Sequence, residues 1–273
     1  MPVKISLKSK PHAHSLPMPL LRSVPVILVA FSAYTTTHAQ QSTETVKPPG
    51  QEKSLKTRAL ETGAKVLQSA RPLQPFDVYL VGFHPMKDDP EHQMEAHHYC
   101  NQVNEEFAQC VLFDGNDDKA NLTGIEYIVS ERIFLELPLE ERKYWHPHNG
   151  EILSGQLMAP GIPQAAEKSL MKSKMNSYGK TWHVWRTGDH DRAGDTYPIG
   201  PAMLAWSFNR DGEAKPAMVE ARDSRLDTNT AETRKNRQDL IELAKPQYGV
   251  DVLKGKFDRP VKDIPGVKEA DPK

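Results

Sequence analysis

Histidine and acidic residues concentrate in the middle of this 273-residue chain. Eight of the eleven histidines lie between His84 and His190, and the other three lie within the first 38 residues. Imidazole and carboxylate groups together suit zinc, manganese or non-haem iron(II), and two histidines with one carboxylate form the ligand set of oxygen-activating iron enzymes. The composition therefore predicts a divalent metal site, with hydrogen-bonded core histidines as the alternative.

The clearest ligand spacing lies in residues 146–151, which are His-Pro-His-Asn-Gly-Glu. Because a residue before proline favours an extended backbone, His146 and His148 can turn their imidazoles toward one ion. Glu151 follows in an arrangement similar to the His-x-His and Glu ligands of cupins, with a shorter gap. Glu126 lies within the apolar segment GIEYIV, where a carboxylate is costly to bury unless it is paired or coordinated. We expect His146, His148 and either glutamate to bind the metal.

The adjacent pair His97 and His98 cannot both serve one ion easily. On a strand they face opposite sides, so that His97 shares a face with Glu95 and Tyr99, and His98 shares the other with Cys100. We expect at most one of the two at the site. The prediction is that His97 or His183 supplies the remaining ligand or an acid/base group.

The candidate ligands are predicted to lie on or beside short helices and short strands. Apolar spacing and end signals predict helices over Ser54–Ala70, Ser130–Phe134, Pro138–Trp145, Pro163–Tyr178 with Gly179 as the stop, and Thr230–Lys245. Compact apolar runs predict strands over Val78–His84, Val111–Asp114, Gly124–Ser130, Thr181–Trp185 and Met203–Phe208. The Gly/Asn/Asp-rich connection between the second and third of these strands favours an antiparallel hairpin. We therefore predict an α+β fold, with a mainly antiparallel sheet and several short helices in a single compact domain.

The first 39 residues contain four basic residues and no acidic one, and an apolar run spans residues 24–33. This run is too short to cross a bilayer but suits a secretory signal, which predicts an exported protein, with an organelle transit peptide as the alternative. We expect a polar linker over 40–53, the folded domain over 54–250 and a flexible charged tail over 251–273.

Charge and hydropathy exclude several partners. Removing the leader leaves 35 − 4 = 31 basic against 36 acidic residues, so we expect no nucleic-acid binding. No later apolar run is long enough for a transmembrane segment in the mature chain. The sequence also lacks the glycine-rich nucleotide motifs, the HExxH helix and the GxSxG elbow, which are typical of nucleotide-binding proteins, zinc proteases and α/β-hydrolases.

Five motifs together carry a resemblance to a known family. They are Glu95-Ala96-His97-His98-Tyr99-Cys100, Val103-Asn104-Glu105-Glu106-Phe107 followed by Gln109-Cys110, Gly124-Ile125-Glu126-Tyr127-Ile128, Trp145-His146-Pro147-His148, and Tyr178-Gly179-Lys180-Thr181-Trp182-His183. In order and spacing they resemble the oil body-associated protein family over roughly Ser54 to Val250. The resemblance implies plant relatives on seed oil bodies and bacterial or fungal relatives without an assigned reaction. The leader departs from the plant pattern, which argues against an oil-body location here.

The two cysteines allow two interpretations. A hairpin centred on Glu105 would place Cys100 opposite Cys110 and allow a disulfide, which export would permit. A helical turn capped by Asn104 would separate them. The resemblance favours reduced thiols, because intracellular plant members carry the same two motifs.

The function predicted from these residues is binding of a divalent metal or a small apolar ligand at the histidine-rich site. One alternative is a metal-dependent enzyme, such as an oxygenase or a hydrolase. The other is a non-catalytic protein on a lipid surface. The tryptophans, including Trp145 and Trp182, are expected in the core, or alternatively in the wall of an apolar pocket.

Overall fold

Five long strands carry the fold in the computed structural model, which describes residues 46–68, 71–189 and 192–271. They are β1 (Val78–Pro85), β2 (Gln93–Asn104), β3 (Phe107–Phe113), β4 (Leu122–Val129) and β6 (Tyr178–His183). The short strands β5 (His146–Pro147) and β9 (Met203–Leu204) both pair with β6, and every pairing in this sheet is antiparallel. The predicted antiparallel β3–β4 hairpin and the α+β class are confirmed.

The sheet curls until its first strand meets the segment after β9. Met86 forms an antiparallel bridge with Ala205, and the amide of Trp206 donates to the carbonyl of Pro85 at 2.8 Å. The amide of Ala205 also donates to the carbonyl of Thr181, in β6, at 3.0 Å. One segment thus joins both sides of the curled sheet, and the sheet gains an inner face on which side chains from non-neighbouring strands meet.

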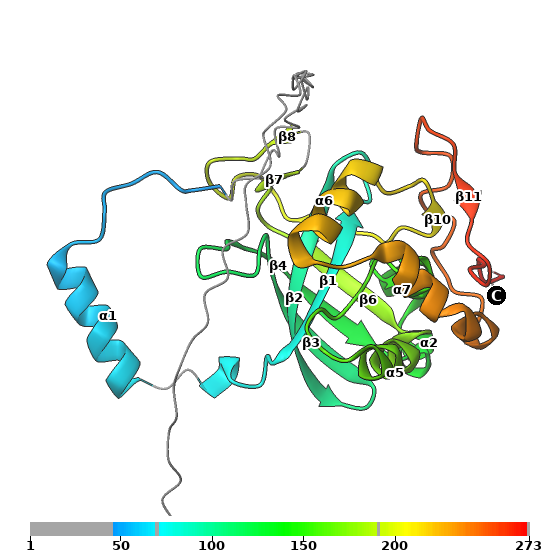
Figure 1. Ribbon diagram of the computed structural model, residues 1–273, viewed down its shortest axis with the longest axis horizontal. Helices are drawn as coiled ribbons and strands as arrows, with labels where there is room; N and C mark the ends of the chain where they lie inside the picture. Colours follow the sequence, from blue (N-terminus) through cyan, green and yellow to red (C-terminus); the bar gives the residue numbers. More distant parts are fainter. Residues whose placement is uncertain (1–45, 69–70, 190–191, 272–273) are drawn as a thin grey trace, which may run out of the picture. The chain divides into compact units, whose positions relative to one another are not determined.

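Helices and the C-terminal segment cover this curled sheet (Figure 1). The largest buried cluster joins inner-face residues such as Leu112 and Ile128 to Ile152 of α4 (Asn149–Ser154) and Met171 of α5 (Gln164–Lys174). A second cluster packs Phe83 and Trp206 with Met218 of α6 (Pro216–Leu226). Both faces of β1 and β2 are therefore buried over part of their length.

Most predicted helices form, with different ends. The side chain of Ser54 caps α1 (Leu55–Leu67), which has no buried residue, and that of Ser130 caps α2 (Glu131–Glu136). The remaining helical segments are η1 (Arg71–Leu73), α3 (Leu139–Arg142), α7 (Thr230–Asn236) and the 3₁₀ helix η2 (Gln238–Leu243). α5 ends at Lys174, so the predicted stop at Gly179 is wrong: Gly179 lies inside β6, paired with both Ile128 and His146.

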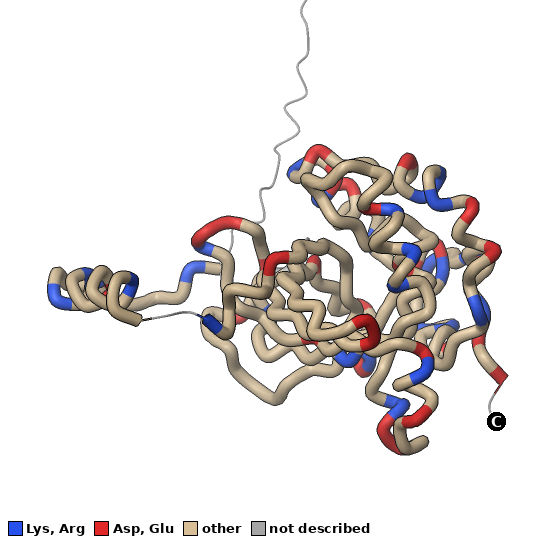
Figure 2. Tube along the Cα trace, turned by 90° about the horizontal axis from the view of Figure 1, so that it is seen from below, with Lys and Arg blue, Asp and Glu red and all other residues tan. Residues whose placement is uncertain are grey.

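The segment 251–271 is packed, which differs from the flexible tail expected from its charge. Leu253, Phe257 and Ile264 are each less than 10% exposed and join the two main clusters. The short strands β10 (Arg210–Asp211) and β11 (Lys262–Asp263) pair here, while β7 (Gly188–Asp189) pairs with β8 (Arg192–Ala193) elsewhere. The physical reason is that sparse apolar residues turn inward while the charged ones between them remain outside. Acidic and basic positions are interspersed along the trace (Figure 2).

The cysteines form a disulfide, which corrects the preference for reduced thiols. Residues Cys100 and Cys110 are directly opposite in the β2–β3 register, with a Cα–Cα distance of 4.1 Å. Asn104 does not cap a helical turn, because its side chain accepts from the amide of Glu106 at 2.9 Å within a tight hairpin. The disulfide lies on the inner face, where Cys110 pairs with Glu126 of β4.

Candidate metal centre

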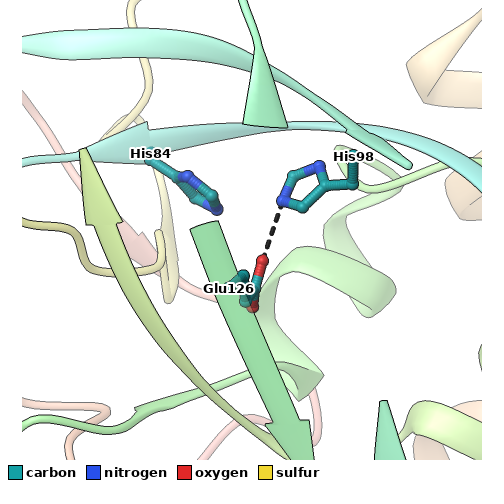
Figure 3. Close-up of side chains that lie close together, drawn as sticks. All are labelled: His84, His98 and Glu126. Carbon is teal, nitrogen blue, oxygen red and sulfur yellow. Dashed lines mark ion pairs between the residues drawn. The ribbon is translucent and has the colours of Figure 1, made fainter. Parts of the chain in front are cut away.

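Strand alternation brings two histidines and a glutamate together on the inner face. His84 lies near the end of β1, His98 in β2 and Glu126 in β4, and all three side chains are at most 3% exposed. The Nε2 of His98 lies 2.9 Å from Oε2 of Glu126. The rings of His84 and His98 are 5.1 Å apart and point, with the carboxylate, toward a common space (Figure 3).

The segment 146–151 supplies the other side of this cluster. β5 pairs with β6, so that His146 lies opposite Gly179, and α4 begins directly after His148. The Nε2 atoms of His148 and His146 lie 3.2 and 3.6 Å from Oε1 of Glu126. Glu151 lies in the first turn of α4 and is buried.

Three overlapping groups within the described ranges could hold a metal ion. They are His84, His98 and Glu126; His84, His146 and Glu151; and Glu126, His146 and His148. Within each group the ligand atoms lie within 4.8 Å of one another. Tetrahedral ligands at about 2.1 Å from an ion lie about 3.4 Å apart, which is close to the spacing around Glu126. Because His84, Glu126 and His146 each occur twice, the groups describe one centre rather than three. We call these six residues the His/Glu cluster.

Gly179 lies closely against three residues of the cluster. A Cβ atom at this position would lie 2.2 Å from Oε1 of Glu126, 2.6 Å from Nε2 of His148 and 2.7 Å from Cε1 of His146. A glycine at this position therefore lets β6 lie directly against the three side chains, which any larger residue would displace.

The hydrogen bonds of two histidines fix which nitrogen faces Glu126. Nδ1 of His98 lies 3.1 Å from the carbonyl oxygen of Ala96, which can only accept, so Nδ1 carries the proton. The hydroxyl of Ser177 donates to the carbonyl of Lys174 and therefore accepts from Nδ1 of His148, at 2.8 Å. In their neutral forms both rings thus present an Nε2 lone pair to the carboxylate. Contacts between acceptors require a cation, either a proton or a metal ion, to be favourable.

Burial sets the protonation of the other groups. Burial would raise the pKa of Glu126, but its contacts with Nε2 of His148 and His98 outweigh it and hold the pKa well below its usual range. Burial, with the charge of Glu126, raises the pKa of Glu151 well above normal. Burial lowers the pKa of His146 to about 3, and neither of its nitrogens has a hydrogen-bond partner among the described residues. His146 is thus neutral near pH 7, as a metal ligand must be.

His97 lies outside the cluster, unlike the ligand expected from the sequence. Its Nδ1 is 2.7 Å from the hydroxyl of Tyr79 and its Nε2 is 2.9 Å from Glu95, on the opposite face of β2. Glu95 in turn contacts Arg225 of α6. The predicted split of faces is confirmed, and the structure brings His98 rather than His97 to the cluster.

The remaining sequence candidates are distributed as follows. His183 lies behind His84, with its Nε2 3.0 Å from Nδ1 of His84, and it belongs to none of the three groups. Trp145 packs in a separate aromatic cluster, and Trp182 lies against Tyr144 at 6.2 Å between ring centroids. Sequence reasoning missed His84, whose only signal was a histidine at the end of an apolar strand.

Comparisons with known proteins agree with the motifs found in the sequence. Residues 70–241 match a family described as "Protein of unknown function (DUF1264)". Oil body-associated protein 1B of Arabidopsis thaliana is 35% identical over 205 residues, which cover 75% of this chain and 82% of that protein. Oil body-associated protein 2A of Zea mays is 37% identical over 204 residues, which cover 74% and 79%. No solved structure matches the chain. None of the helices in the described ranges has the length and apolar character needed to span a bilayer.

Proposed function

Since this chain belongs to the oil body-associated protein family, whose description assigns no function, we propose a function from its site: the His/Glu cluster binds one divalent transition metal ion. The mixed imidazole and carboxylate donors favour zinc, manganese or iron(II), and the cluster contains no sulfur ligand that would select copper(I). His84, His98, His146 and His148 offer nitrogens, and Glu126 and Glu151 offer oxygens.

The observation that carries this proposal is the contact of two histidine lone pairs with one buried carboxylate. Nε2 of His98 and Nε2 of His148 both face Glu126, while their Nδ1 protons are used elsewhere. Every ion-pair partner found for Glu126 among the described residues is a histidine, and Glu151 adds a second buried carboxyl. One divalent cation satisfies the carboxylate of Glu126 and both lone pairs, whereas protons would have to charge both buried rings.

One metal ion needs fewer than six protein ligands, so some residues of the cluster can take part in a reaction beside the ion. A bound ion of this type supplies Lewis acidity or, as iron(II), oxygen activation. Glu151, whose pKa is raised by burial, can hold a proton beside the ligands. His183 contacts His84 and can orient its ring. If the protein is an enzyme, the proposed metal centre would therefore be that of an oxygenase or a hydrolase.

The adjacent histidines provide a matched test. His98→Gln is expected to reduce metal affinity roughly 10- to 100-fold or more, because it removes a ligand. His97→Gln changes the next residue of the same strand on the opposite face, and it should leave metal content unchanged. Elemental analysis by mass spectrometry of both purified proteins gives the answer. Equal metal content in the two variants would refute the proposed ligand set.

We also propose that the protein is exported. The acid-free leader, residues 1–39, lies outside the described residues, so support comes from the sequence and from the Cys100–Cys110 disulfide, which is typical of oxidising compartments. The mass of the protein from its native cells should correspond to a chain beginning after Ala39. A mature protein that keeps the leader would contradict export.

A second candidate function is association with a lipid surface, which the names of the relatives suggest. α1 favours it, because four of its large apolar side chains are at least 65% exposed: Leu55, Leu60, Val66 and Leu67. Flotation with phospholipid-coated oil droplets should survive metal chelation and be lost in Leu60→Glu/Leu67→Glu. A wild-type protein that does not float would exclude this function.

A further inference from the structure

The outer face of the sheet, opposite the His/Glu cluster, carries an apolar row that crosses all five long strands. The strand register places five side chains opposite one another in turn, from β1 to β6: Tyr79, Tyr99, Val111, Ile125 and Trp182. We call these five residues the outer row. Each of them is at least partly exposed, and Ile125 in β4 is 40% exposed. Contiguous apolar surface that remains in contact with water is typical of a binding surface.

Neighbouring aromatic rings widen the outer row into a larger patch. Tyr79 stacks on Tyr99 with 5.2 Å between ring centroids, and Phe113 packs edge-on against Tyr99 at 5.7 Å. Tyr127, on the same face of β4, is 37% exposed and stacks on Phe107 at 6.0 Å. The outer row is therefore the centre of a continuous aromatic surface.

The helix α1 has an apolar face and no buried residue. At about 100° per residue, its four exposed apolar side chains lie within an arc of about 140°. Arg58, Glu61 and Lys65 lie on the opposite side of the helix. Because a free helix of 13 residues is only marginally stable in water, a partner for the apolar face would stabilise α1.

The chain on both sides of α1 is tied to the sheet that carries the outer row. Before α1, the side-chain amide of Asn121, next to the start of β4, donates to the carbonyl of Val46 at 2.8 Å. After α1, residues 68–77 lead into β1, whose second residue is Tyr79. Five strands span about 19 Å and α1 is about 20 Å long, so the helix is long enough to cover the row.

We propose that α1 docks its apolar face on the outer row of the same chain. The inference goes beyond the metal proposal and does not depend on it, because the His/Glu cluster lies on the other face of the sheet. The two tethers keep α1 at a high effective concentration beside the row, which favours the chain's own helix over a second copy. Docking covers both apolar surfaces and leaves the charged side of α1 in water.

Amide hydrogen exchange of residues 54–68 in the full-length protein tests this docking. In the wild type these amides should exchange roughly tenfold or more slowly than in Leu60→Glu/Leu67→Glu, since an undocked helix opens readily. Ile125→Glu changes only the outer row and should accelerate exchange in α1 to a similar extent. The matched control Ile162→Glu changes an isoleucine that is 43% exposed outside the row, and it should leave α1 protected.

A second substitution in the row guards against a folding defect. Val111→Thr keeps a β-branched side chain in β3, so the strand should form, but it makes the row more polar. It should also accelerate exchange in α1, by a smaller factor than Ile125→Glu. Thermal unfolding of each variant shows whether the sheet is intact.

The outcomes separate the possible partners of α1. Equal exchange in the wild type and in Leu60→Glu/Leu67→Glu overturns the docking. Protection that increases with protein concentration identifies a second copy, and protection that requires phospholipid-coated droplets and is unchanged by Ile125→Glu identifies a lipid surface; both overturn the intramolecular contact. Protection of α1 in a protein without metal supports the docking even if the metal proposal fails.

Discussion

The Glu126→Gln protein is expected to keep its fold and lose its metal. Glu126 is the shared ligand of two of the three groups, and its oxygens lie 2.9, 3.2 and 3.6 Å from three imidazole nitrogens. Glutamine keeps the shape but removes the charge, so metal affinity should fall more than about 100-fold. Its amide can donate to an Nε2 lone pair, so that without metal the variant should be as stable as the wild type or more stable.

Metal content and thermal unfolding with and without chelator measure both effects. The matched control is Glu136→Gln, which changes an exposed glutamate that pairs with Arg132 on α2. It should change neither metal content nor the chelator response. A Glu126→Gln protein that retains stoichiometric metal, or that is destabilised equally with and without chelator, would show that Glu126 has only a structural role.

Gly179→Ala is expected to have the other large effect. The added Cβ would lie within 2.7 Å of atoms of Glu126, His148 and His146, and these side chains are buried on all sides. Relieving such overlap costs roughly 1–3 kcal/mol of unfolding free energy and displaces the ligands. We therefore expect loss of bound metal together with a lower midpoint of thermal and denaturant unfolding.

Another glycine-to-alanine change serves as the control. Gly63 lies in the exposed helix α1, and a Cβ there would meet nothing within 4 Å. Gly63→Ala should therefore leave metal binding intact and should not lower stability. If Gly179→Ala behaves like Gly63→Ala, the close packing of Gly179 against Glu126, His148 and His146 does not hold the metal ligands in place.

Local patterns predicted much of the fold. The caps Ser54 and Ser130, the β3–β4 hairpin and the face split of His97 and His98 all follow from the sequence within a few residues. The choice between the two histidines did not follow, because both are buried. α6 covers the face of β2 that carries His97, where Arg225 contacts Glu95. The alternation of side chains along a strand therefore does not show whether its second face is also buried.

The parts that the sequence did not predict depend on long-range contacts. His84 meets His146 and His183 where the sheet closes through Pro85 and Trp206, which are 121 positions apart (206 − 85). Gly179 lies within β6 rather than at a helix end, since β5 and β4 both pair with it. The segment 251–271 packs because its few apolar residues contact the two main clusters. The number of charged residues in the segment does not reveal these contacts.

The metal centre can be tested by X-ray absorption at the metal edge of the wild-type protein, purified without added metal. We expect about one equivalent of zinc, manganese or iron, with nitrogen and oxygen ligands at about 2.0–2.2 Å and the outer-shell scattering of imidazole rings. No sulfur ligand at about 2.3 Å should appear, since both cysteines are joined in the disulfide. A protein without stoichiometric metal, or an ion without imidazole ligands, would contradict the metal centre.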